Sequence, residues 1–516
     1  MATHPVLSKL KDASLFIEKG FIDGSWVKAR SGQTFDVFNP ATDERLGACP
    51  DFSVDETGRA IHAASDAFPS FRDMKPRERA RLLRRWYDIV MENADDLAIL
   101  LTLENGKPLA EARGEVVYAA SFLEWFSEEA PRVYGDTVPA SNTPGNSQVM
   151  TVREPVGVCA LITPWNFPAA MITRKAGAAL AAGCTTIIKP AGETPFTANA
   201  LVELARRAGM PRGVLNVVTA SQAQTPAVGT VLTSSPLVHK VSFTGSTAVG
   251  KLLMQQCAGA SPGGTLKKVS LELGGNAPFI VFDDADLDAA VDGAIISKFR
   301  ASGQTCVCAN RLYVQAGIYD AFASRLAARV RRDFVVGNGI DARTTHGPLI
   351  HGRAAAKAES HVLDAVTKGA RVLVGGASPE TKSAAGAALS TTSFVLPTVL
   401  TEVTSDMKIA FEETFGPVAG LFRFSTEEEA LRLANGTDYG LAAYVFSRDV
   451  HRAWRVARAL DVGMVGLNTG IISDAAAPFG GVKSSGFGRE GSKYGIEEYM
   501  SVKTITLGAE RIQSRL

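Results

Sequence analysis

Cysteine is scarce in this chain. Six cysteines among 516 residues are too few to build a framework of disulfide bonds, and they fit a reducing compartment. The seven histidines are scattered, and no spacing of cysteine and histidine resembles a zinc site. The sequence therefore excludes a small disulfide-stapled protein and predicts no metal centre.

Long apolar runs and an excess of charge are also missing. No stretch of about 18 consecutive apolar residues occurs, so we expect no transmembrane helix. The formal net charge of +1 gives no reason to expect nucleic acid or an anionic membrane as a partner. The N-terminal segment lacks the marks of a secretory or organellar leader. The expected location is cytoplasmic, or mitochondrial if a leader precedes the sequence given.

Strand-length apolar runs alternate with helix-length segments over much of the chain. Clear examples are a strand at 156–162, a helix at 169–182 stopped by Gly183, and a strand at 266–273. A longer helical region is expected over 76–106. Repeated strand–helix–strand units predict parallel sheets with helices on both faces, and therefore an α/β fold.

Two cysteines, Cys306 and Cys308, lie in a polar, turn-like stretch that runs from Gly303 to Arg311. A free cysteine is usually a small buried hydrophobe. The polar surroundings also suit a thiol presented to a substrate. From the spacing alone, the packed and the reactive interpretations are equally good.

Several polar positions could assist a reactive thiol or hold an anion. The glycine motif of ordinary dinucleotide-binding folds, Gly-x-Gly-x-x-Gly, follows none of the predicted strands. Gly245-Ser246 follows a strand and opens a helix, which suits either phosphate binding or a tight turn. Glu272, at the end of an apolar strand, and Glu413 could each be a general base or a surface charge. Asn166, between prolines and aromatic residues, could donate to an oxyanion or form a turn.

Six motifs stand in the order and rough spacing of one known family. They are Pro164-Trp165-Asn166-Phe167-Pro168, Lys189-Pro190-Ala191, Phe243-Thr244-Gly245-Ser246, Glu272-Leu273-Gly274-Gly275, Gly303-Gln304-Thr305-Cys306 and Glu413-Thr414-Phe415-Gly416-Pro417. With them the chain resembles the aldehyde dehydrogenase superfamily from about residue 20 to 505. Three further motifs look like its succinate-semialdehyde dehydrogenase branch, namely Met171-Ile172-Thr173-Arg174-Lys175, Cys306-Val307-Cys308 and Gly488-Arg489-Glu490-Gly491-Ser492-Lys493-Tyr494-Gly495.

The resemblance implies a cysteine-based oxidation of an aldehyde. Cys306 would attack the aldehyde carbon, and Asn166 with the Cys306 N–H would hold the oxyanion. Glu272 would then activate water to hydrolyse the thioester. The branch implies oxidation of succinate semialdehyde to succinate, with glutarate semialdehyde or a broad range of aldehydes as the alternatives.

The resemblance also implies an anion site and a redox-active pair. Arg174, Arg300 and Ser473 match the positions that bind the substrate carboxylate in this branch, although Asp474 departs from it. Cys308 is either a small loop residue or the resolving thiol of a redox switch with Cys306. Reversible inactivation by peroxide that is lost in Cys308→Ala would distinguish the two.

An NAD(P) cofactor follows from the same resemblance. NAD-preferring relatives often carry a glutamate after Lys-Pro-Ala, where this chain has Gly192. A carboxylate at this position would repel the 2′-phosphate of NADP, and this chain has none there. We therefore expect NADP to be preferred and NAD to be accepted. The implied cofactor-binding residues are Trp165, Asn166, Lys189, Pro190, Ala191, Gly192, Gly245, Ser246, Gly250, Leu273, Glu413 and Phe415.

We predict two parallel-sheet α/β domains, one of them a Rossmann-like cofactor domain, and a small β oligomerisation element. The cofactor-binding domain would comprise 1–133 and 153–271, and the catalytic domain 272–485. The segments 134–152 and 486–516 would form the oligomerisation element, because a terminal strand leaves an open edge for another subunit. The expected assembly is a homodimer or a homotetramer.

Overall fold

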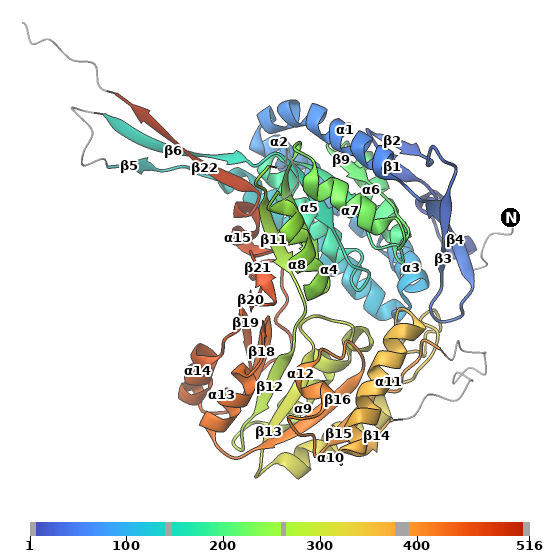
Figure 1. Ribbon diagram of the computed structural model, residues 1–516, viewed down its shortest axis with the longest axis vertical. Coiled ribbons are helices and arrows are strands. Elements are labelled where there is room, and N and C mark those ends of the chain that lie inside the picture. The colour runs from blue at the N-terminus through green and yellow to red at the C-terminus, as the bar shows by residue number, and fades with distance from the viewer. Residues whose placement is uncertain (1–6, 140–146, 260–264, 377–391, 509–516) are drawn as a thin grey trace, which may run out of the picture.

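A computed structural model describes residues 7–139, 147–259, 265–376 and 392–508. Figure 1 shows two large α/β bodies, one above the other, and a narrow β-sheet that projects from the upper body. The parts of the predicted domains and oligomerisation element that lie outside the described residues are 1–6, 140–146, 260–264, 377–391 and 509–516.

The upper body is built on an eight-stranded sheet. Its strands are β1 (Gly20–Ile22), β2 (Ser25–Val27), β7 (Val158–Ile162), β8 (Thr185–Lys189), β9 (Leu215–Val217), β10 (Val238–Thr244), β11 (Lys268–Glu272) and β21 (Gly486–Phe487). They lie in the order β2-β1-β9-β8-β7-β10-β11-β21. The strands from β9 to β11 are parallel, and β1 and β21 join them antiparallel.

Helices cover both faces of this sheet. They are α1 (Val54–Asp73), α2 (Pro76–Glu92), α3 (Ala94–Asn105), α4 (Leu109–Glu129), α5 (Ala170–Ala182), α6 (Pro195–Arg207), α7 (Thr225–Ser234) and α8 (Thr247–Cys257). Alternate residues of β7 enter two different apolar clusters: Cys159 and Leu161 pack with the α2–α6 side, and Val158 and Ala160 with the side of α1, α7 and α8. A strand buried on both faces explains the continuous apolar run in the sequence.

The lower body is built on a seven-stranded sheet. Its strands are β12 (Ala277–Val281), β13 (Ala309–Gln315), β14 (Arg371–Val374), β15 (Thr398–Thr401), β16 (Val418–Phe424), β18 (Ala442–Phe446) and β19 (Met464–Leu467). They lie in the order β14-β15-β16-β13-β12-β18-β19, and every pair except β14–β15 is parallel. Its helices are α9 (Leu287–Phe299), α10 (Tyr319–Asp333), α11 (Gly352–Thr367), α12 (Lys408–Phe411), α13 (Glu427–Asn435) and α14 (Val450–Ala459).

The projecting sheet is antiparallel and joins distant parts of the chain. It contains β5 (Thr137–Val138), β6 (Gln148–Pro155) and β22 (Met500–Leu507) in the order β22-β6-β5, and the short helix α15 (Ser492–Glu497) precedes β22. The remaining elements are β3 (Thr34–Phe38), β4 (Arg45–Pro50), β17 (Tyr439–Gly440), β20 (Val482–Lys483), η1 (Leu7–Lys9), η2 (Ala13–Leu15), η3 (Ala130–Arg132) and η4 (Arg300–Gly303). The predicted α/β class is confirmed, whereas the predicted division into domains stays a prediction.

The expected helical region over 76–106 contains two helices. It is divided between α2 and α3 at Asn93, whose φ of −106° and ψ of 17° leave the helical region. Its side-chain Nδ2 donates to the Ile89 carbonyl at 2.8 Å and thereby ends α2. The helix predicted over 169–182 is confirmed as α5, with Gly183 left-handed at φ 99°.

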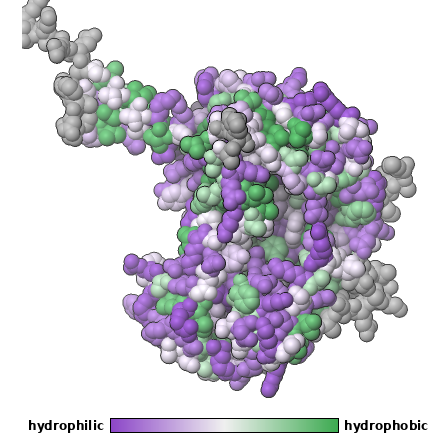
Figure 2. Space-filling model, viewed as in Figure 1, coloured by the Kyte–Doolittle hydropathy of each residue, from purple (hydrophilic) through white to green (hydrophobic). Residues whose placement is uncertain are grey.

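The strand ends of the upper sheet face the lower body. The segments that follow β7, β10 and β11 leave the sheet at its carboxyl edge, which is where parallel α/β sheets bind ligands. The face shown in Figure 2 is hollowed between the two bodies. No helix within the described residues is long and apolar enough to cross a membrane.

Candidate active site

Two adjoining cavities lie in this hollow and collect most of the predicted site residues. One of about 360 Å³ is lined by Trp165, Asn166, Gly245, Ser246, Leu273, Cys306, Glu413 and Phe415, among others. The other, of about 710 Å³, is lined by Trp165, Lys189, Ala191, Gly192 and Gly245, among others. Both volumes suit small-molecule binding. Because they share Trp165 and Gly245, they form one elongated cleft.

The cysteine predicted as nucleophile lies on a tightly constrained loop. Ala301 and Ser302 adopt left-handed φ values of 51° and 55° directly before Gly303 at 76°. A Cβ at Gly303 would lie 2.2 Å from the Gly416 carbonyl oxygen, so the loop packs closely against the segment that carries Glu413. The structure therefore places the cysteine loop and the Glu413 loop side by side.

Cys306 is partly buried, and burial raises the pKa of its thiol to about 12. The positive charge of Arg174 acts in the opposite direction, and the carboxylate of Glu272 adds to the rise. In the ligand-free protein the thiol is therefore protonated at neutral pH.

Asn166 is oriented toward this loop by its own hydrogen bonds. Its Oδ1 accepts from the Phe167 N–H at 3.1 Å, which fixes the other end of the amide. Its Nδ2 donates to the Gln304 carbonyl at 3.0 Å, two residues before Cys306. Because an amide NH₂ has two hydrogens, one remains to donate to an oxyanion on the substrate.

Glu272 is buried at the end of β11, with 3% of its surface exposed. Its Oε2 has no hydrogen-bond partner among the described residues. Burial, followed by the charge of Glu490, raises the pKa of this carboxyl, while Arg174 and Lys175 oppose the rise. A raised pKa brings a carboxyl closer to the value that suits a general base near neutral pH.

Gly245-Ser246 forms the tight turn that was one of its two interpretations. Ser246 caps α8 by accepting from the Val249 N–H at 3.4 Å. The same turn lines both cavities, so the capped helix N-terminus also faces the cleft. Phosphate binding there is compatible with the turn and stays a prediction.

Ionisable groups of opposite sign face the cleft at two further predicted positions. Burial lowers the pKa of Lys189 to about 8, although Glu193 opposes this. Burial raises the pKa of Glu413 to about 7, although its Oε1 accepts from the Gly275 N–H at 3.1 Å. Trp165 and Phe415 meet edge to face in the cleft, with ring centres 5.7 Å apart.

Two predicted cofactor residues do not line either cavity. Pro190 is buried between Lys189 and Ala191, which do line one. Gly250 lies inside α8, where a Cβ would approach the Leu273 side chain to 2.3 Å. The structure therefore gives Gly250 a packing role beneath Leu273.

Two of the three predicted anion-binding residues share a small cavity with Thr305 and Val307, the chain neighbours of Cys306. Arg300 and Ser473 line a narrow cavity of about 10 Å³. Arg174 is 2% exposed, forms a short ion pair with Glu490 and lies 4.4 Å from the centre of the Phe479 ring. Its Nη2 is buried and has no hydrogen-bond partner among the described residues.

Sequence analysis missed Tyr118 of α4. Burial raises the pKa of its phenol, while Arg174 and Ser473 act against the rise, so the three groups are neighbours. The helical spacing of Glu111, Glu115 and Tyr118 was the signal that could have found it, since these positions share one face of α4.

Cys308 is buried, and burial raises the pKa of its thiol. Its Sγ donates to the Lys298 carbonyl at 3.5 Å. The redox role of Cys308 stays a prediction.

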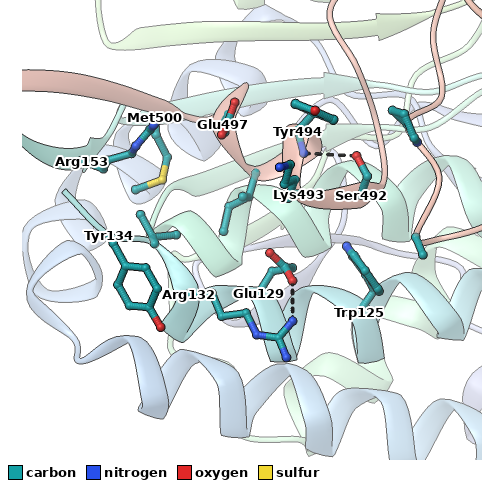
Figure 3. A pocket seen from close by; sticks show the side chains of 14 residues that line it. Trp125, Glu129, Arg132, Tyr134, Arg153, Ser492, Lys493, Tyr494, Glu497 and Met500 are labelled. Carbon is teal, nitrogen blue, oxygen red and sulfur yellow. Dashed lines mark hydrogen bonds and ion pairs between the residues drawn. The ribbon is translucent and has the colours of Figure 1, made fainter. Parts of the chain in front are cut away.

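A separate cavity of about 580 Å³ lies at the base of the projecting sheet. Figure 3 shows Trp125, Arg132 and Tyr134 facing Lys493 and Tyr494 across it. Arg132 is paired with Glu129 at 2.9 Å. None of the predicted site residues lines this cavity.

Comparisons with known proteins identify the family of the chain. The model of the aldehyde dehydrogenase family matches residues 26–505. Glutarate-semialdehyde dehydrogenase of Pseudomonas aeruginosa is 56% identical over 97% of this chain and 99% of its own. NADP(+) succinate-semialdehyde dehydrogenase of Escherichia coli is 55% identical over 97% of this chain and 100% of its own. The crystal structure of succinate-semialdehyde dehydrogenase from Burkholderia pseudomallei matches with a TM-score of 0.91 and 57% identity, covering 97% of this chain and 100% of that one. This chain belongs to the aldehyde dehydrogenase family.

Proposed function

We propose that the protein oxidises succinate semialdehyde to succinate, with NADP as the preferred cofactor and NAD as an accepted one. The observation that carries the proposal is the buried guanidinium of Arg174, whose Nη2 has no hydrogen-bond partner among the described residues and whose charge opposes the rise in the pKa of Cys306. A cation so close to the nucleophile suits an aldehyde that ends in a carboxylate. Relatives named for this substrate are 51–57% identical to the chain.

Each step of the proposed reaction is assigned to a residue of the cleft. Cys306 first loses its thiol proton to solvent. The thiolate then adds to the aldehyde carbon, and the resulting oxyanion accepts hydrogen bonds from Asn166 Nδ2 and from the Cys306 N–H. Loss of hydride leaves a thioester on Cys306. Glu272, as a carboxylate, takes a proton from the water that attacks this thioester and releases the acid.

The cleft fits a dinucleotide cofactor. Its larger cavity runs past Lys189 and Gly192 to Gly245, where the N-terminus of α8 supplies N–H groups for a pyrophosphate. Lys189 and Glu413 would hold ribose hydroxyls. When bound, the cofactor accepts the hydride that leaves the former aldehyde carbon.

Replacement of the anion-binding arginines tests the substrate class. We expect Arg300→Ala and Arg174→Ala to raise KM for succinate semialdehyde at least about tenfold, because a buried charge-assisted contact is lost. The KM for butanal, which has no carboxylate, should change little. Steady-state NADPH formation measures both. Equal effects on the two aldehydes would exclude carboxylate recognition by these residues.

Glutarate semialdehyde is the second candidate, because two relatives at 56% identity are named for it. It is one methylene longer, and one methylene usually changes kcat/KM by about 10–200-fold. The ratio of kcat/KM for the two semialdehydes therefore decides between them. A ratio near one would indicate a broad-range enzyme.

Gly192 tests the cofactor preference. We expect Gly192→Glu to lower kcat/KM for NADP at least about tenfold and to spare NAD, because its carboxylate would repel the 2′-phosphate. A Cβ at Gly192 would lie 3.1 Å from the Ala220 carbonyl oxygen, so Gly192→Ala is the control for the steric part. An unchanged NADP/NAD ratio in Gly192→Glu, or a wild-type enzyme that prefers NAD, would contradict the assignment.

The projecting sheet supports a homo-oligomer, either a dimer or a tetramer. β22 lies at its edge, and Val502, Ile505 and Leu507 are 58%, 43% and 59% exposed. An unpaired apolar edge strand of this kind favours pairing with a second copy. Sedimentation at the mass of a single subunit at micromolar concentration would refute this proposal.

A further inference from the structure

A buried pair of charges lies behind the oxyanion loop and takes no part in the steps above. Lys107 and Glu115 are 4% and 3% exposed, and their side chains form a short ion pair. Desolvation makes such a pair a poor source of stability, because apolar residues of similar volume often do as well. The contacts of this pair indicate another reason for its presence.

Both members of the pair bind the main chain around Asn166. Lys107 Nζ donates to the Asn166 carbonyl at 2.9 Å, and it lies 3.9 Å from the centre of the Phe167 ring. Glu115 Oε1 accepts from the Ala169 N–H at 3.0 Å, immediately before α5. The loop that carries Asn166 is therefore held on both sides of Phe167.

A third carboxylate links the same helix to the loop of the nucleophile. Glu111 lies one helical turn before Glu115 in α4, and its Oε2 accepts from the Ala301 N–H at 2.9 Å. Ala301 has a left-handed φ of 51° and begins the strained approach to Cys306. One face of α4 thus contacts both the loop of Asn166 and the loop of Cys306.

We propose that Lys107, Glu111 and Glu115, the α4 bracket, are positioning residues that set the Asn166 amide against Cys306. The inference rests on the proposed function, since it requires Asn166 to be the oxyanion donor. None of the three touches the reacting atoms in this arrangement. A displacement of about 1 Å in such a donor is enough to cost on the order of 10²-fold in rate, so the bracket acts through geometry.

A double-mutant cycle with Asn166 tests the bracket. Lys107→Met/Glu115→Gln removes both charges of the pair together, and the charge of Arg300 still acts on the buried carboxyl of Glu111. We expect the burst rate of NADPH formation to fall about 10–100-fold in the wild-type background. In the Asn166→Ala background the same pair of changes should cost less than about threefold, because the group that they position is gone.

A merely structural role gives a different result. Equal fold losses in the two backgrounds, or an unchanged burst rate in the wild-type background, would overturn the bracket. If Asn166→Ala itself leaves the burst rate unchanged, the oxyanion assignment in the proposed function fails instead. The dissociation constant for NADP, measured by fluorescence titration, should stay within about twofold and reports folding of the cofactor site.

Three further variants complete the design. Lys107→Arg keeps a charged donor and should recover most of the burst rate. Glu111→Ala tests only the contact with the loop of Cys306, and it replaces the double variant if that variant fails to bind NADP. We expect it to slow the burst about tenfold. An unchanged burst rate would count against the bracket. Arg113→Ala is the matched control on the same helix, because its side chain is 61% exposed and pairs only with Asp95 among the described residues.

Discussion

Cys306→Ala should abolish aldehyde oxidation, with a fall in kcat/KM of about 10⁴-fold or more. The thiol is the only sulfur that lines the cavity of about 360 Å³ among its described lining residues, so no neighbouring side chain can form the thioester. NADP affinity should be unchanged within about twofold, because the large cavity that would hold most of the cofactor is not lined by Cys306. Stopped-flow absorbance at the NADPH maximum measures the loss.

Cys308→Ala is the matched control for this prediction. It removes a thiol two positions away that donates to the Lys298 carbonyl at 3.5 Å and does not line the cavity. Dehydrogenase activity should therefore stay within a few-fold of wild type. Substantial turnover in Cys306→Ala would overturn the assignment of the nucleophile.

The same thiol should show a steep pH dependence in the cofactor-free protein. A pKa raised to about 12 leaves little thiolate at pH 7, and the thiolate is the reactive form. The rate of alkylation of Cys306 by iodoacetamide should therefore rise about tenfold per pH unit from pH 7 to about pH 10. Mass spectrometry of the labelled peptide separates Cys306 from the other cysteines.

Glu272→Gln should separate the two halves of the reaction. Thioester formation does not require Glu272 as a base, so a burst of about one NADPH per active site should remain. Steady-state turnover should fall about 10²–10⁴-fold, because the general base for hydrolysis is gone. Quenched-flow trapping of acylated Cys306 measures the accumulated intermediate, and a burst that disappears together with turnover would contradict this division of roles.

The pH profile gives the second test of Glu272. Burial and Glu490 raise its pKa above the ordinary value of 4.5, and only the ionised carboxylate acts as a base. Wild-type turnover limited by hydrolysis should therefore be low below this raised pKa and increase as the pH rises through it. Glu272→Gln should lose that rise, whereas Glu128→Gln, an exposed position on α4, should keep it.

The sequence was sufficient for the class of fold and for the candidate nucleophile. Alternating strand and helix patterns depend on which face of each element is buried, and this local property is visible in one sequence. Cys306 could be predicted because a polar turn and ordered motifs surround it. The break at Asn93 could not, because the apolar period continues through it and a single side-chain hydrogen bond to Ile89 ends the helix.

The tertiary structure alone decided what supports the site. The ion pair of Lys175 with Glu490 joins residues 315 positions apart, and Lys107 reaches Asn166 across 59 positions. Helical spacing places Glu111 and Glu115 on one face, but it does not show what that face meets. The sequence by itself determined the α/β fold, the family and the proposed nucleophile. Only the folded chain brought buried charges beside Asn166, Glu272 and Cys306. Contacts from distant segments fix the position of Asn166, and burial with charges from distant segments shifts the pKa values of Glu272 and Cys306.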